Sequence, residues 1–118
     1  MTTLFERLGG KPAVNAAVDI FYTKVIADAS INHLFSGVDM PRQIAKQKAF
    51  LTYAFGGAES YSGKSMREAH KHLNLTEDHF NAVAGHLKST LEELDVPQEL
   101  QDEVMQVVGS THDDVLNL

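Results

Sequence analysis

Six histidines make this 118-residue chain rich in possible metal ligands. They are His33, His70, His72, His79, His86 and His112. Imidazole is the commonest metal ligand in proteins, but it is also a common surface group. The residues around each histidine therefore have to indicate which of them could bind a metal.

His70 lies in the segment 65–73, SMREAHKHL, which opens with the S-x-x-E spacing of a helix-capping box. In a helix, Met66, His70 and Leu73 would share one face. A histidine on such an apolar face is either buried and hydrogen-bonded or a ligand that points into an apolar cavity. Spacing alone favours the first of these. A helix of about two turns is unstable by itself, so packing or a ligand must hold it.

A second candidate site lies on a helix predicted over residues 40–55. One stripe of this helix consists of Gln43, Gln47, Phe50 and Ala54, with Lys46 at its edge. Buried amides and amines cost free energy unless they are paired. The stripe is therefore either a solvated surface or a polar patch inside a ligand pocket, and helix geometry does not choose between them.

Several other chemistries are excluded by the sequence. The chain has no cysteine, which rules out disulfides, iron–sulfur clusters and thiolate zinc sites. No pair of histidines has the H-E-x-x-H spacing of a zinc protease, and no glycine-rich loop has the spacing that binds phosphates.

The elements that must position these residues are helical throughout, because apolar residues recur with helical periodicity. The stripes are Val14, Val18, Phe21, Tyr22 and Val25; Phe80, Val83, Ala84, Leu87, Leu91 and Leu94; and Leu100, Val104, Val107 and Val108. We predict an all-α protein with helices near 3–8, 11–27, 31–35, 40–55, 65–73, 76–94 and, last, 97–110. Glycine pairs at 9–10 and 56–57 mark breaks, and Asp39 and Thr76 are predicted N-caps.

Composition favours a soluble single domain, and the lack of cysteine fits the cytoplasm; we also expect a monomer. Apolar residues make up 43% of the chain, enough for one core, and the formal net charge is −6. An acidic surface argues against nucleic acid or an anionic membrane as a partner. Residues 1–8 lack the pattern of a signal peptide, and no apolar run approaches the roughly 20 residues of a membrane span.

Motifs in order along nearly the whole chain carry a family resemblance. They are LFERLGG at 4–10, Phe21-Tyr22, Phe35, Val38-Asp39-Met40, QKAFLTYAFGG at 47–57, MREAH at 66–70 and DVLN at 114–117. With these motifs the chain resembles the group I truncated haemoglobins, and the cyanobacterial globins among them. The resemblance implies a two-over-two helical sandwich around haem b, formed by residues 1–118 as one truncated globin domain.

The resemblance also assigns roles to residues. His70 would be the proximal iron ligand, Phe35 would pack on the porphyrin, and Tyr22, Gln43 and Gln47 would donate hydrogen bonds to bound O₂. The other implied haem contacts are Lys46, Phe50, Tyr53, Phe55, Tyr61, Met66 and His112. Gln43 could instead face solvent.

Two positions depart from the close relatives. Lys46 stands where those relatives have a distal histidine, so it is a candidate sixth ligand, displaced by gases; alternatively it extends to solvent or to a haem propionate. His112 lies near the position of a histidine that bonds covalently to a haem vinyl group. The stretch before the tail is shifted, so His112 is either that cross-link or an exposed terminal histidine.

The resemblance implies reversible binding of O₂, NO and CO, with nitric oxide dioxygenation as the enzymatic version. In that reaction ferrous haem carrying O₂ oxidises NO to nitrate and is left ferric, so an unidentified reductase must act as partner. The alternatives are oxygen storage and electron transfer or redox sensing by a six-coordinate haem with Lys46 bound. A binding module without cofactor would leave His70 and the polar stripe unexplained.

Overall fold

The structure, a computed structural model, describes residues 3–58 and 75–116. Its helices are α1 (Leu4–Leu8), α2 (Gly10–Ala27), the 3₁₀ helix η1 (Asn32–Phe35), α3 (Met40–Ala54), α5 (Glu77–Glu93), α6 (Gln98–Ser110) and α7 (His112–Leu116). No strand occurs in these two ranges, so the predicted all-α class is confirmed. The helix predicted over 65–73 lies outside the described residues.

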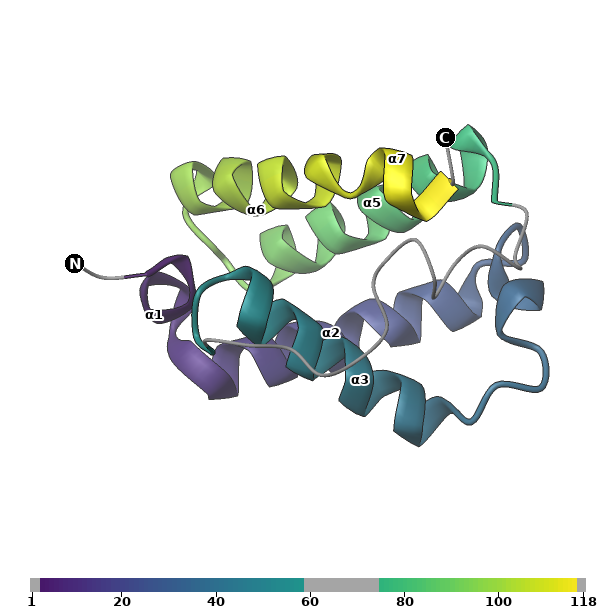
Figure 1. Cartoon of the computed structure of the whole chain (residues 1–118), viewed down its shortest axis with the longest axis horizontal. Helices are drawn as coiled ribbons and strands as arrows, with labels where there is room; N and C mark the ends of the chain where they lie inside the picture. The colour runs from purple at the N-terminus through teal and green to yellow at the C-terminus, as the bar shows by residue number, and fades with distance from the viewer. Residues whose placement is uncertain (1–2, 59–74, 117–118) are drawn as a thin grey trace.

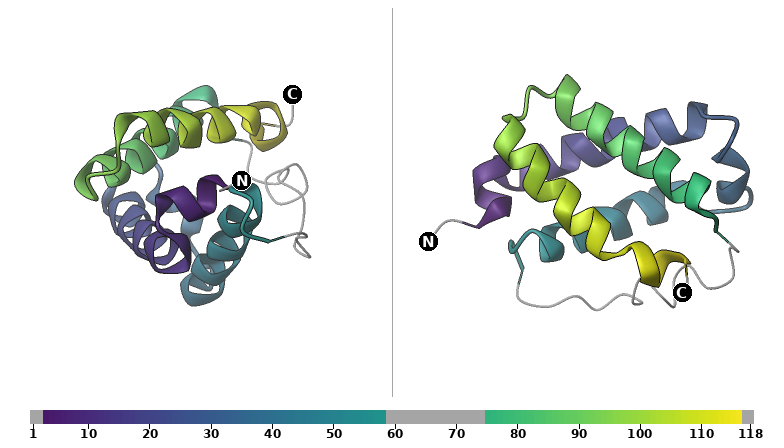
Figure 2. Two further views of the ribbon diagram at one scale, coloured as in Figure 1. Left: turned by 90° about the vertical axis from the view of Figure 1, so that its left-hand side faces the viewer. Right: turned by 90° about the horizontal axis from the view of Figure 1, so that it is seen from above.

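The helices form two layers (Figure 1). α2 packs against α3 in one layer, α5 packs against α6 in the other, and α2 also contacts α5 across the interface. The two further views in Figure 2 show the same arrangement from the end and from above, with α1 at the end of the sandwich. α1 contacts both α2 and α6, which closes that end.

The centre of the core is α2. All five residues of its predicted stripe, Val14, Val18, Phe21, Tyr22 and Val25, are buried. They pack with Ile31, Leu51, Phe55, Leu87, Leu91 and Val104 from the surrounding elements. Full burial of one such side chain contributes about 1.5–3 kcal/mol, so the stripe fixes the rotation of α2 about its axis.

The predicted breaks at the glycine pairs are also present. Gly9 has φ 117°, a left-handed conformation that ends α1 before α2 begins at Gly10. Gly57 lies so close to Phe5 that a Cβ atom would stand 2.5 Å from the ring. The Phe5 N–H also donates a 2.8 Å hydrogen bond to the Phe55 carbonyl. Together these two contacts hold α1 against the C-terminal end of α3.

Both predicted N-caps are confirmed. The Asp39 carboxylate accepts a hydrogen bond from the Arg42 N–H at 3.3 Å at the start of α3. At the start of α5, the Thr76 hydroxyl accepts from the His79 N–H, and His79 Nδ1 accepts from the Thr76 N–H, each at 3.2 Å. The histidine thus takes the place that glutamate or glutamine usually occupies in a capping box.

The structure refines the predicted elements at three places. The helix predicted at 31–35 is a short 3₁₀ helix. Leu94 follows the end of α5 and is 36% exposed, although it lines an apolar pocket together with Leu87 and Leu91 of the stripe. The helix over 98–110 is not the last, because the chain turns at Thr111 and continues as α7.

Asp28, at the C-terminal end of α2, ties this helix to α5. Its carboxylate accepts from the Ser30 N–H and hydroxyl and lies 2.7 Å from His86 Nε2 on α5. The hydrogen bond from the Ser30 hydroxyl, followed by those from His86 and from the Ser30 N–H, lowers the pKa of Asp28 to about 2. In the part of the chain that the structure describes, no helix is long and apolar enough to cross a membrane.

Candidate functional site

Tyr22 and Gln43 form a polar pair between α2 and α3. The Gln43 side-chain amide donates a hydrogen bond to the Tyr22 hydroxyl at 3.2 Å. Tyr22 is only 5% exposed, and Gln43 is half-buried. The structure therefore directs the Gln43 amide toward Tyr22, while the side chain as a whole is half-buried.

The environment keeps the Tyr22 phenol protonated. Burial raises its pKa above the ordinary value of 10, and the hydrogen bond from Gln43 offsets this only in part. Because the hydroxyl oxygen accepts from Gln43, its own proton remains available to donate. No group among residues 3–58 and 75–116 accepts that proton. The pair can therefore offer a hydrogen-bond donor inside an apolar region.

Aromatic rings surround this donor. Phe21 contacts Tyr22 edge-on with 5.1 Å between ring centroids, and Phe35 does so at 5.9 Å. Phe50, one of the predicted haem contacts, is half-buried against the same core, and Gln47 is half-buried on α3. The structure thus gathers a phenol, the Gln43 amide and the rings of Phe21 and Phe35 where α2 meets α3.

Other predicted residues of α3 lie differently. Lys46 is exposed, and Tyr53 is 42% exposed. Phe55, which follows α3, is buried at 6% exposure among core residues of α1 and α2. Tyr61, Met66 and His70 lie outside the described residues.

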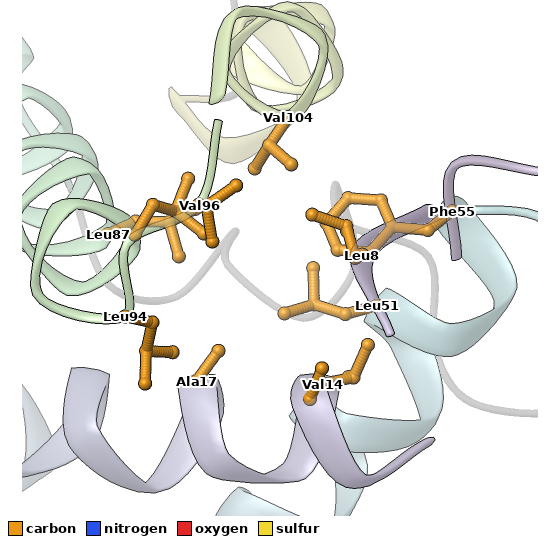
Figure 3. Close-up of a pocket in the computed structure, with 11 residues that line it drawn as sticks. Leu8, Val14, Ala17, Leu51, Phe55, Leu87, Leu94, Val96 and Val104 are labelled. Atoms are coloured by element: carbon orange, nitrogen blue, oxygen red, sulfur yellow. The ribbon is translucent and has the colours of Figure 1, made fainter. Parts of the chain in front are cut away.

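An apolar cavity of about 160 Å³ lies in the core, at the end of the sandwich near α1 (Figure 3). Residues of both layers line it, among them Val14, Leu51, Phe55, Leu87 and Val104. An apolar cavity of about 150 Å³ stays dry and can bind a molecule as large as benzene. The sequence predicted Val14, Leu87 and Val104 as core positions and Phe55 as a haem contact, but it did not predict the cavity, because periodicity does not reveal gaps in packing.

His112 lies at the start of α7 beside the first turn of α5. Its Nε2 is 2.6 Å from a Glu77 carboxylate oxygen, and its Nδ1 is 2.9 Å from an Asp113 oxygen. The Phe80 ring meets the imidazole edge-on, with 4.9 Å between the ring centroids. These contacts raise the pKa of His112 above 6.5, with the Asp113 hydrogen bond as the largest cause. Sequence analysis missed Glu77 as its partner.

No cluster of three or more His, Cys, Asp or Glu side chains that could hold a metal occurs within the described ranges.

The bacterial-like globin family model matches residues 3–117. The chain belongs to this globin family. Group 1 truncated haemoglobin GlbN of Synechocystis sp. is 54% identical over 123 aligned residues, which cover 99% of both chains. A group 1 truncated haemoglobin of Chlamydomonas moewusii is 53% identical, over 98% of this chain and 69% of that protein.

Solved structures of truncated haemoglobins share the fold. The 2/2 haemoglobin of Synechococcus sp. PCC 7002, in the cyanomet state with covalently attached haem, has a TM-score of 0.96 and 49% identity over 99% of this chain and 100% of that one. The Fe(III) truncated haemoglobin of Tetrahymena pyriformis has a TM-score of 0.93 and 43% identity, over 98% of each chain. The resemblance and the two-over-two globin sandwich are therefore confirmed.

Membership in this family implies haem and the binding of small gas ligands. The described residues fit such a group chemically. Tyr22 and Gln43 are neutral donors held among aromatic rings, which suits an apolar macrocycle with a partially negative gas ligand beside it. The family assignment and the donor set thus agree.

Proposed function

We propose that this truncated haemoglobin binds haem b through His70 and reversibly binds O₂, NO and CO. The observation that supports this most directly is the buried Tyr22 hydroxyl, which accepts from Gln43 and retains its own proton for donation. When bound, haem supplies an iron that takes up diatomic gases and at which O₂ can oxidise NO to nitrate.

The chain's own residues then set how long a gas stays bound. Tyr22 donates to the partially negative atom of the ligand, Gln43 holds the phenol in place, and half-buried Gln47 supplies a further amide. A hydrogen bond of this kind contributes about 1–3 kcal/mol. It acts on the bound ligand alone and therefore slows dissociation rather than association.

We also propose nitric oxide dioxygenation as the reaction of this site. The donors at Tyr22 and Gln43 support it because they retain O₂ until NO arrives, and the apolar cavity of about 160 Å³ can hold a second small apolar molecule. A separate reductase then returns the haem iron to the ferrous state. We propose that the protein acts as a monomer in the cytoplasm. Nitrate should form at a rate near the diffusion limit when the oxygenated protein is mixed with NO; slow formation would leave gas storage as the function.

The test of the central proposal is an optical spectrum of the chain reconstituted with haem, ferric and then ferrous. The wild-type chain should show the absorption bands of a histidine-bound haem, and His70→Ala should lose them or need added imidazole to restore them. His72→Ala, which removes a ring two positions away, is the matched control and should retain them. Loss of these bands in both variants, or in neither, would contradict the role of His70.

Lys46 is our proposed sixth ligand when no gas is bound. It lies on α3 between Gln43 and Gln47, and its side chain is exposed, so it would have to turn toward the haem to bind iron. Lys46→Ala should convert a low-spin ferric spectrum to high-spin. Lys48→Ala, on the same helix and paired with Asp19 at 3.0 Å, should leave the spectrum low-spin. A Lys46 that gases cannot displace would instead favour electron transfer.

The covalent haem link at His112 is likewise a proposal. His112 is a candidate by its position near the tail, and the Synechococcus haemoglobin was solved with covalently attached haem. After reduction, acid–butanone should extract the haem from His112→Ala but not from the wild-type protein.

A further inference from the structure

Two carboxylates, those of Glu77 and Asp113, hold the His112 ring. Glu77 belongs to the first turn of α5, and Asp113 is the next residue along α7. Their oxygens lie 2.6 Å from Nε2 and 2.9 Å from Nδ1, so both ring nitrogens face an acceptor. Among the described residues these are the charged groups that contact the ring, and the Phe80 edge is the apolar one.

This arrangement holds the imidazole in its charged form. An ionised carboxylate only accepts hydrogen bonds, so a ring nitrogen beside each carboxylate must carry a proton. The hydrogen bonds that the ring donates to Asp113 and Glu77 accordingly raise the pKa of His112, against a smaller opposing effect of desolvation. An imidazolium with both nitrogens protonated has no in-plane lone pair and cannot act as a nucleophile.

Covalent attachment requires that lone pair. The step adds an imidazole N–H across the vinyl double bond of haem: a bond forms between nitrogen and one vinyl carbon, and the other vinyl carbon gains a proton. The protonated ring gives up one proton beforehand to expose its lone pair, and the second nitrogen keeps the other. No electrons enter or leave, so the addition needs no oxidant or reductant.

The two carboxylates differ in where they are anchored. Asp113 neighbours His112 within the five-residue helix α7, so it accompanies the ring when α7 shifts. Glu77 belongs to α5, where the positive end of the helix dipole stabilises its charge after the ring has left. A displacement of α7 toward a vinyl group would therefore break the contact with Nε2 and keep the contact with Nδ1.

We propose that Glu77 and Asp113 act in opposite directions on covalent haem attachment at His112. Glu77 restrains the reaction by occupying Nε2. Asp113 is a positioning residue that keeps the remaining proton on Nδ1, so that Nε2 is the nitrogen that bonds to haem. This inference rests on the proposed haem binding and covalent link. Haem binding and the covalent link could each occur without these roles of Glu77 and Asp113.

The test measures cross-linking in the haem-reconstituted protein. Wild-type, Glu77→Gln, Asp113→Asn and His112→Ala proteins are reduced with dithionite at several pH values. The fraction of haem that resists acid–butanone extraction is followed over time, and the mass of the haem-bearing chain is confirmed. Asp78→Asn is the matched control, because it removes an exposed carboxylate in the same turn as Glu77.

Glu77→Gln should cross-link about threefold faster near pH 7, with its pH midpoint moved to lower pH, since each unit of pKa changes the ratio of neutral to charged ring tenfold. Asp113→Asn should cross-link more slowly than wild type at high pH, where the ring is neutral in both. Asp78→Asn should match the wild type. A shift in the pH midpoint of cross-linking shows that the substitution changes the pKa of the His112 ring. A general loosening of α7 would change the rate without moving this midpoint.

Equal or slower cross-linking in Glu77→Gln would overturn the inference, as would equal acceleration by Asp78→Asn, or cross-linking of Asp113→Asn at high pH that is as fast as in the wild type. Normal haem spectra without cross-linking in any variant would also overturn it, while leaving haem and gas binding intact. Absence of the haem spectrum would refute the proposed function itself, so the two failures are separable.

Discussion

The Tyr22–Gln43 pair and the His112 cluster use similar hydrogen bonds in opposite environments. At the first site, two neutral groups meet in the buried interface of α2 and α3, 3.2 Å apart and among aromatic rings. At the second, a histidine lies between two carboxylates at a surface corner of α5 and α7, with exposed fractions of 28% for His112 and 62% for Glu77. Burial therefore makes the first site insensitive to pH and salt, and exposure makes the second respond to both.

The largest effect should come from removing the buried donor. Tyr22→Phe deletes the hydroxyl that we assign to the bound gas and retains the ring packed against Phe21 and Phe35. Loss of a bond of about 1.4 kcal/mol should raise the O₂ dissociation rate about tenfold. Stopped-flow displacement of O₂ by CO measures this rate.

Thr23→Val is the control for this variant, because it removes a neighbouring hydroxyl that bonds only to its own helix, at the Asp19 carbonyl. It should leave O₂ dissociation unchanged. An equal rate in Tyr22→Phe and wild type would remove the functional contrast between the two sites.

A smaller effect should follow from Gln43→Ala. This change leaves the Tyr22 hydroxyl in place but removes the amide that orients it at 3.2 Å. O₂ dissociation should accelerate about threefold, which corresponds to roughly 0.6 kcal/mol, at the low end for a hydrogen bond. If Gln43→Ala instead exceeded Tyr22→Phe, Gln43 rather than Tyr22 would be the donor to the gas.

Local patterns predicted most of the fold and part of each site. The stripe from Val14 to Val25 was predictable because helix periodicity selects one buried face, and the caps at Asp39 and Thr76 were predictable because a cap needs only neighbours in sequence. The contact of Glu77 with His112 spans 35 residues and depends on how α7 packs on α5. Sequence periodicity carries no information about such a contact.

The direction of Gln43 illustrates the same limit at the distal site. Its stripe could be recognised from spacing, but whether that stripe faces solvent depends on the rotation of α3 against α2, which tertiary packing sets. α7 was missed for a related reason: five residues after Thr111 are too few to show a periodic apolar pattern.

Salt should separate the two sites next. Raising the ionic strength from about 0.02 to 0.5 M shortens the screening length to a few ångströms and weakens the exposed pair of Glu77 and His112. Cross-linking of the wild-type protein should then accelerate roughly twofold, and O₂ dissociation, governed by the buried Tyr22, should stay constant. In Glu77→Gln the acceleration by salt should be smaller, because only the contact of His112 with Asp113 remains to be screened. A salt-dependent O₂ dissociation rate would show that the distal site is more exposed than its geometry indicates.

The smallest effect concerns stability and its pH dependence. The pKa of His112 is raised above 6.5 in the folded state, so its contacts favour the folded state fully below that value, and this contribution disappears as pH rises through the folded-state pKa. Denaturant midpoints of the haem-loaded wild type and Glu77→Gln should therefore differ near pH 6 and converge toward pH 9. The difference should be small because exposed ion pairs contribute little. The Tyr22→Phe variant supplies the contrast. The Tyr22 phenol of the wild type stays protonated throughout this range, because burial raises its pKa above 10, so the offset between this variant and the wild type should not vary with pH. A difference for Glu77→Gln that grew with rising pH would mean that His112 is held as a neutral ring, and would contradict the charged state on which the restraint by Glu77 depends.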